Sequence, residues 1–315
     1  KDKEIKDFLA KDYKSYSKQI IDLEKKISIS NEQPNFTGEE LRKRQYLSGI
    51  SIEDLELILH PMAEEGKEAS GSMGDDTPVA VLSSHFRPVS HYFRQNFSQV
   101  TNPPIDSLRE NKVMSLKTRF GNLGNILDFD NLTEEDIFVL DSPILTNSQF
   151  KKFNKIFLKK IKVIDSTFSV KSSLKSRIKE IREECETAVR EGCAALILSD
   201  KNISNERASI PSVLAVGAVH SHLIKHGLRG YCSINVECSD ALDTHSFAVL
   251  VGVGATTINP YLAIDSIYQR FEKKLFSKSD FEDCIKKYKK SIDSGLLKIM
   301  SKMGISVISS YRGGC

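Results

Sequence analysis

The sequence predicts an α/β fold in which repeated strand–helix units form a mainly parallel sheet. Three apolar runs with strand character, residues 161–165, 194–200 and 231–237, recur at intervals of about 35 residues. Helical stretches separate these runs, and a glycine stands where each helix would end. Strands joined by helices pair in parallel with right-handed crossovers, which leaves an open sheet and an incomplete, TIM-barrel-like arrangement as the two expectations.

The elements before these units are predicted from periodicity and capping residues. Residues 4–27 carry apolar side chains at helical spacing and predict a helical approach segment. Residues 31–38 contain proline, glycine and asparagine and predict a break. Ser51 and Asp54, followed by an apolar run, form a capping-box-like pattern that predicts a helix start.

Further helices and strands follow from the same signals in the second half of the chain. Helices are expected over residues 172–191, before Gly192, and 211–226, before Gly227. A third helix is expected over residues 243–253, with a short strand after it at 256–258. Residues 306–311 also have strand character.

The composition is that of an ordinary globular protein with a substantial core. The chain has 315 residues, of which 40% are hydrophobic and 28% charged, and its formal net charge is only +3. So small a basic excess argues against nucleic-acid and membrane-surface binding. No apolar run reaches the about 18 residues that a membrane span needs, so the sequence predicts a soluble, cytoplasmic protein. A first residue other than Met predicts that the chain is a piece of a longer polypeptide.

The six cysteines do not predict a disulfide framework in a chain of this length. Cys232 and Cys238 are spaced as in some iron–sulfur sites. They also alternate with Ile234 and Val236 on one face of a predicted strand. Buried thiols are therefore expected at both positions.

Two loop-like segments, residues 61–78 and 99–106, are the strongest candidates for function. Glycines in the first allow close backbone approach, and prolines stiffen both. Asp75 and Asp76 are too polar for core positions. Loops of this composition predict a shaped surface that faces a partner.

Other candidate motifs fail when each is compared with the chemistry it would need. Gly252-Val253-Gly254 lacks the third glycine of a dinucleotide site, and Gly66-Lys67 lacks the context of a phosphate loop. His222 and His226 stand one helical turn apart, but the sequence shows no third metal ligand, and ordinary surface histidines are the expectation. Ser199-Asp200 ends a predicted strand, where βα folds place chemistry, and by itself decides little.

Longer stretches of the sequence resemble the central domain of the glutamate synthase large subunit. The resemblance lies in residues 59–63, 71–78, 92–95, 99–110, 113–116, 198–200, 219–224, 252–255 and 258–263. Residues 295–313 resemble the start of that enzyme's flavin domain, and residues 2–6 resemble the tail that leaves its amidotransferase domain. The chain departs from the family pattern at Lys201, Ser221, Ser246, Val253, Gly314 and Cys315. The departures at Ser221 and Ser246 weaken a catalytic role for the neighbouring histidines.

The resemblance implies a division of the chain into three parts. Residues 1–35 would follow the amidotransferase domain as a linker and helical tail, residues 36–275 would form the central domain, and residues 276–315 would begin the FMN-binding domain. The family converts glutamine, 2-oxoglutarate and reductant into two molecules of glutamate. Ammonia released by the amidotransferase domain travels inside the protein to the flavin domain.

The implied cofactors of the full-length enzyme are FMN and a 3Fe–4S cluster, and none is expected on this fragment, which is predicted to be inactive when isolated. The implied partners are the amidotransferase and FMN domains of the same polypeptide, together with a small reductase subunit or ferredoxin. No nucleic acid, membrane or metal is expected to bind.

The resemblance and the two loops together predict the site residues. Ser72, Met73 and Gly74 are expected to abut the flavin and 2-oxoglutarate site, and Thr101 and Asn102 to line the ammonia tunnel. Asp75 and Asp76 would fix the loop by accepting backbone hydrogen bonds. No catalytic residue is expected. A pure interdomain scaffold and a free-standing βα enzyme with a site near Ser199-Asp200 are the alternatives.

Overall fold

The computed structural model describes residues 2–13, 20–69, 82, 84, 87–93, 105–106, 108–124, 137–157, 160–277 and 280–313. Its centre is a parallel sheet of four strands, β4 (Ile161–Asp165), β6 (Ala195–Ser199), β8 (Ser233–Glu237) and β9 (Thr257–Asn259). The strands lie side by side in chain order, β4-β6-β8-β9, and every pairing is parallel. This order is that of part of a βα barrel and confirms the predicted α/β fold.

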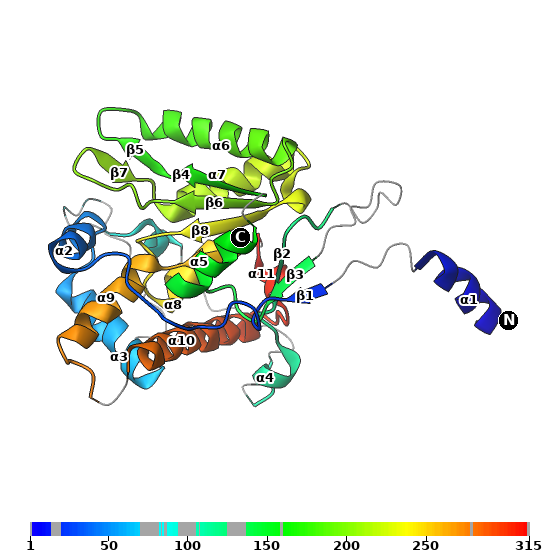
Figure 1. The fold of residues 1–315 in the computed structure, drawn as a ribbon, viewed down its shortest axis with the longest axis horizontal. Helices are drawn as coiled ribbons and strands as arrows, with labels where there is room; N and C mark the ends of the chain where they lie inside the picture. The colour runs from blue at the N-terminus through cyan, green and yellow to red at the C-terminus, as the bar shows by residue number, and fades with distance from the viewer. Residues whose placement is uncertain are drawn as a thin grey trace.

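Helices connect the strands and cover the sheet. The connections are α6 (Leu174–Arg190), α7 (Ser212–Lys225) and α8 (Thr244–Gly252), and α9 (Tyr261–Glu272) follows β9. Figure 1 shows α6 and α7 together on one side of the molecule, with α3 (His60–Glu65) and α10 (Phe281–Lys302) on the opposite side. The strands and helices predicted between residues 161 and 258 therefore lie within a few residues of their observed bounds.

Smaller elements surround this centre. The strands β1 (Ile20–Asp22), β3 (Ile137–Leu140) and β2 (Thr118–Phe120) form a second sheet, in which β1 is parallel and β2 antiparallel to β3. An antiparallel pair, β5 (Thr167–Ser169) and β7 (Arg207–Ser209), follows the ends of β4 and β6. The remaining helical elements are α1 (Asp2–Tyr13), α2 (Gly38–Leu47), η2 (Asp54–Leu59), η3 (Val89–Tyr92), α4 (Glu110–Val113), α5 (Asn147–Ile156), η4 (Arg229–Tyr231) and α11 (Ile308–Tyr311).

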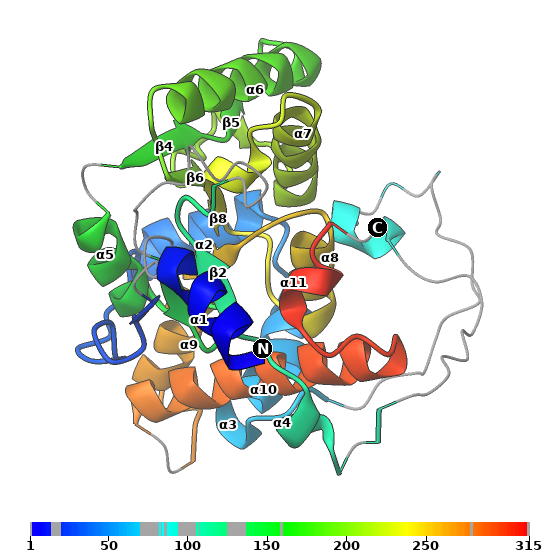
Figure 2. The ribbon, with the colours of Figure 1, turned by 90° about the vertical axis from the view of Figure 1, so that its right-hand side faces the viewer.

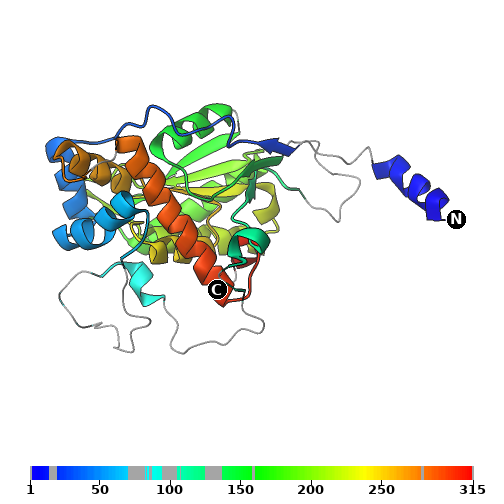
Figure 3. The ribbon, with the colours of Figure 1, turned by 90° about the horizontal axis from the view of Figure 1, so that it is seen from below.

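The core depends on α10, a long amphipathic helix that runs beneath α8 and α9 (Figure 2) and crosses the face seen in Figure 3. Its buried side chains recur at helical spacing and include Phe281, Ile285, Tyr288, Ile292, Leu296 and Met300. They join one hydrophobic cluster with the strands and with α6, α7, α8 and α9. The predicted FMN-domain start at residue 276 therefore lies beside a helix that packs into this core.

Two expectations from periodicity were wrong. The helix predicted over residues 4–27 ends at Tyr13, and Ile20–Asp22 forms β1 because these residues pair with β3, more than a hundred residues away. Residues 306–311 are not a strand. Only Val307 makes a bridge, to Ser115, and Ile308 is buried at the start of α11.

Candidate functional site

The predicted site residues Ser72, Met73, Gly74, Asp75, Asp76, Thr101 and Asn102 all lie outside the described residues. The structure describes the ends of both segments. In the first, the loop expectation was wrong for residues 61–65, which belong to α3, and the carboxylate of Glu68 accepts a hydrogen bond from the backbone N–H of Thr244, at 3.3 Å. Between the loops, the carbonyl of Ser90 lies 2.8 Å from Nε2 of His245. Both contacts are made to the first turn of α8.

The second loop returns to the body beside α10. The backbone N–H of Ile105 donates to the carbonyl oxygen of Ser301 at 3.4 Å, and the hydroxyl of Ser301 donates to Glu110 at 2.9 Å. The first turn of α8 and the later half of α10 also touch each other, through Thr244 and Gly295. The flanks of both loops therefore meet one face, formed by α8 and α10.

The other candidate place is the carboxyl edge of the parallel sheet, where βα folds bind ligands. The strands end there in polar residues: Asp165, Ser199, Glu237 and Asn259. Asp200, directly after β6, is 1% exposed and accepts hydrogen bonds from the backbone N–H and the hydroxyl of Ser239, at 2.9 and 2.7 Å. Burial raises the pKa of Asp200 to about 6.

A second set of contacts closes the same edge around Glu237. The hydroxyl of Ser199 donates to Glu237 at 2.6 Å, and Nζ of Lys201 lies 2.6 Å from its other carboxylate oxygen. Both oxygens are therefore engaged, and the Ser199 hydroxyl faces a carboxylate that is already paired. The described contacts give Ser199 no free base, so they do not assemble a nucleophile.

The N-terminal segment lies over this edge. Asp265 accepts hydrogen bonds from the backbone N–H groups of Asn35 and Phe36, at 2.9 and 3.0 Å, and from the side-chain amide of Asn147 at 3.0 Å. Burial raises the pKa of Asp265 to about 7. The guanidinium of Arg44 stacks on Phe36 at 3.6 Å and donates to the carbonyl of Lys201 at 2.8 Å.

The edge does not fit the phosphate of a flavin nucleotide. Three carboxyl groups, those of Asp200, Glu237 and Asp265, converge on it, and an anionic ligand needs backbone N–H groups or cations instead. Cations at this edge are bound to groups of the chain itself: Arg44 to the carbonyl of Lys201, Lys201 to Glu237, and Arg207 to Asp165. The polar groups at this edge are therefore bound by other groups of the same chain.

The cysteines are placed as the strand pattern predicted. Cys232 and Cys238 are 3% and 1% exposed and share a hydrophobic cluster with Ile234 and Val236. Burial raises the pKa of Cys232 to about 12 and that of Cys238 well above its ordinary value. Protonated, buried thiols of this kind are poor cluster ligands.

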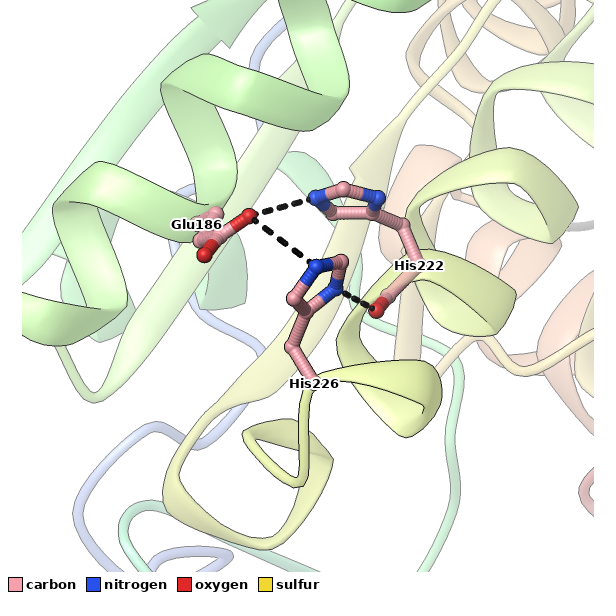
Figure 4. Close-up of side chains that lie close together, drawn as sticks. All are labelled: Glu186, His222 and His226. Atoms are coloured by element: carbon pink, nitrogen blue, oxygen red, sulfur yellow. Dashed lines mark hydrogen bonds and ion pairs between the residues drawn. The ribbon is translucent and has the colours of Figure 1, made fainter.

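Sequence reasoning missed one residue, Glu186, which lies 36 positions before His222. Glu186 is on α6 and faces His222 on α7 and His226 directly after α7 (Figure 4), so a third potential metal ligand is present. No local signal marks it, since α6 and α7 are neighbours only in the folded chain.

In the described part of the chain, no helix is both long and apolar enough to cross a membrane.

Comparison with known proteins identifies relatives of most of the chain. A family model described as glutamate synthase central domain matches residues 43–315. The chain is 52% identical over 323 aligned positions to the "Glutamate synthase [NADPH] large chain" of Azospirillum brasilense, covering 100% of this chain and 21% of the relative. It is 41% identical to the protein of that name from Bacillus subtilis, covering 99% and 20%. It is also 41% identical to "Ferredoxin-dependent glutamate synthase 2, chloroplastic" of Arabidopsis thaliana, covering 88% and 18%.

The chain thus spans about a fifth of the length of these relatives. Among solved structures, the flavin-binding domain of baker's yeast flavocytochrome b2 is 17% identical, with a TM-score of 0.33 over 58% of this chain and 40% of that one.

Proposed function

Because this chain belongs to the glutamate synthase family and corresponds to its central domain, we propose that it joins the amidotransferase and FMN domains of a glutamate synthase large chain and helps to line the ammonia tunnel between them. The complete enzyme would form two glutamates from glutamine, 2-oxoglutarate and reductant. The chain itself would contribute no catalytic group.

The observation that carries this proposal is where the described ends of the two loop-like segments are bound. Their described flanks are bonded to α8 and α10, through Glu68, Ser90 and Ile105. The chain continues from α10 to α11, towards the part of the family's polypeptide that would hold FMN. Loops that start from this face would be able to meet the next domain.

From β1 to α11 the chain is fixed to the described body, whereas α1, exposed over residues 2–9, stands away from it (Figure 1). Near the N-terminus, β1 pairs with β3, and Leu23 and Ile27 are fully buried. Near the C-terminus, Ile308 is fully buried, and the backbone N–H of Gly313 donates to the carbonyl of Gly252 at 2.7 Å. A domain that follows Gly313 would therefore start from a fixed point, while a domain before this chain would be joined through α1.

The proposed roles within the loops rest on what an ammonia path needs. Ammonia must pass without contact with bulk water, which would protonate or dilute it. Ser72, Met73 and Gly74 would form a wall of the flavin and 2-oxoglutarate site, and Thr101 and Asn102 would line the tunnel. Asp75 and Asp76 would hold the first loop in shape.

Cofactors, partners and boundaries belong to the same proposal. FMN and the 3Fe–4S cluster would be bound outside this chain, because the sheet edge does not fit a phosphate and Cys232 and Cys238 are buried thiols. A reductase subunit or ferredoxin would supply electrons; relatives are named for NADPH and for ferredoxin. We also propose that the chain divides after residues 35 and 275 into a linker, the central domain and the start of the FMN-binding domain, and that the protein is cytoplasmic.

The test is the Thr101→Leu variant of the complete polypeptide, in which a branched apolar side chain would block a polar path. We expect glutamine hydrolysis to exceed 2-oxoglutarate consumption by at least about twofold, with free ammonia in solution. The control is Thr187→Leu, an exposed position on α6. Matched rates of hydrolysis and consumption in Thr101→Leu would contradict the tunnel and favour a pure scaffold.

A further inference from the structure

Three side chains meet where α6 packs against α7: Glu186 on α6, His222 on α7 and His226 directly after α7. Nε2 of His222 lies 2.7 Å from one carboxylate oxygen of Glu186, and Nε2 of His226 lies 3.9 Å from the same oxygen. One potential ligand atom from each residue lies within 4.8 Å of the other two. Figure 4 shows both rings turned towards the carboxylate.

A hydrogen bond determines which nitrogen of the neutral His226 ring carries the hydrogen. Nδ1 of His226 lies 2.8 Å from the backbone carbonyl of His222, which can only accept, so Nδ1 carries the hydrogen. The neutral ring then has its lone pair on Nε2, facing Glu186 at a distance too long for a hydrogen bond. A histidine whose other nitrogen donates to a carbonyl is the usual arrangement at metal sites.

The carboxylate is also held in place. Nε and Nη2 of Arg190 lie 2.9 and 2.8 Å from one oxygen of Glu186, which leaves the second oxygen to the two histidines. Both histidines lie at the C-terminal end of α7, where the helix dipole favours cations.

We propose that Glu186, His222 and His226 bind a divalent cation of the zinc type, which links α6 to α7. Two imidazole nitrogens and one carboxylate oxygen are ligands that zinc accepts, and water would complete the coordination. The adjoining cavity of about 430 Å³ has room for that water.

The positive charges around the cavity favour a metal that binds imidazole nitrogen over one that is bound through oxygen ligands and charge. Lys179, Arg182 and Lys225 line it, with Lys179 3.8 Å from Glu183. These cations disfavour Ca²⁺ and Mg²⁺, which are bound through charge and oxygen ligands. Zinc forms stronger bonds to imidazole nitrogen and depends less on the net charge of the site.

Binding requires a small rearrangement and the loss of one proton. With bonds of about 2.0–2.1 Å in tetrahedral geometry, the ligand atoms must come to about 3.3 Å from one another. The half-exposed ring of His226 can move to meet this spacing. The hydrogen that His222 shares with Glu186 leaves for solvent as Nε2 binds the metal.

The test is equilibrium dialysis of the complete polypeptide against Zn²⁺, with total bound zinc measured for each variant. The wild type should bind one more zinc ion than the His222→Gln/His226→Gln double variant. Glu186→Gln should weaken that site by more than about tenfold, the lower bound for loss of a supporting group. Zinc should also raise the thermal unfolding temperature of the wild type and not of the double variant.

The matched control is Glu183→Gln, which removes a carboxylate from the same helix and cavity but not from the ligand set. It should bind zinc as the wild type does. Equal zinc content in the wild type and double variant would overturn the proposal. So would equal weakening by Glu183→Gln and Glu186→Gln, which would indicate diffuse attraction to surface carboxylates. Circular dichroism without metal verifies that each variant is folded.

Discussion

Asp265 shows how one buried carboxyl group fixes a distant segment of the chain. It is fully buried on α9, and it receives backbone N–H groups from Asn35 and Phe36, about 230 residues earlier. Two competing effects act on its charge: the hydrogen bonds stabilise the carboxylate, and burial destabilises it. Burial is the larger, because the pKa is raised to about 7.

This raised pKa predicts a pH dependence of stability with a definite sign. Between pH 4 and 7 the folded state holds a proton on Asp265 that the unfolded state has lost, so this group's contribution to stability falls as pH rises. In Asp265→Asn the contribution is absent. The free energy of unfolding of the wild type minus that of the variant should therefore fall by up to about 1.4 kcal/mol per pH unit over this range.

Urea unfolding of the chain and its variant at pH 4.5 to 7.5 measures the difference. A constant difference would show that Asp265 ionises in the folded state as easily as in water, and one that grows with pH would show that it ionises more easily; either result would contradict the prediction.

The burial of single residues could be predicted where the local sequence has a strand or helix pattern. Contacts between residues that only folding brings together could not be predicted. The alternation around Cys232 and Cys238 predicted their burial, since a strand has a period of two. Glu186 left no signal, because it meets His222 only through helix packing. Ser199 and Asp200 were correctly placed at a strand end, but Asn35 and Arg44, which help to close that edge, are too far away in sequence to suggest it.

At the scale of elements, Gly295 sets how closely α10 approaches α8. A Cβ atom at this position would lie 2.4 Å from Cγ2 and 2.7 Å from Oγ1 of Thr244. Gly217 in α7 is a natural comparison, because a Cβ there would meet only Val253, at 3.9 Å. Both glycines lie inside helices, where alanine is intrinsically better by about 1 kcal/mol.

We therefore expect opposite effects from the same substitution. Gly295→Ala should destabilise the chain by about 1–2 kcal/mol net, because the cost of overpacking exceeds the helix-propensity gain. Gly217→Ala should be neutral or stabilising by up to about 1 kcal/mol. Thr244→Ser, which removes the methyl group at 2.4 Å, should recover part of the loss in Gly295→Ala. Urea unfolding measures all four proteins, and a Gly295→Ala variant as stable as Gly217→Ala would contradict this account.

The elements also divide by whether their signals are local. β4, β6 and β8 and their connecting helices were predicted because apolar runs and terminal glycines mark each one. β1 was missed because Ile20–Asp22 becomes a strand only by pairing with β3. Residues 306–311 resemble a strand, but only Val307 pairs, and the chain turns at once into α11.

On the scale of the whole molecule, the parallel sheet and the segment that covers it belong together. The carboxyl edge of such a sheet is the usual ligand site of βα folds. Here Lys201 pairs with Glu237 and also donates to Asn35, while Asp265 holds the backbone of the same segment. The N-terminal segment thus closes the edge at which a free-standing enzyme would bind its substrate.

This closure predicts that the chain alone does not bind FMN. Binding would displace the segment around Asn35 and bring a phosphate against Asp200, Glu237 and Asp265, so we expect a dissociation constant weaker than about 1 mM. Titration followed by flavin fluorescence measures it, with the complete polypeptide, expected to carry flavin, as the positive control. Saturable binding in the micromolar range that Asp200→Asn changes would instead place a ligand site at this edge and favour the free-standing enzyme. Binding that Asp200→Asn leaves unchanged would equally contradict the prediction and would direct the search to another surface.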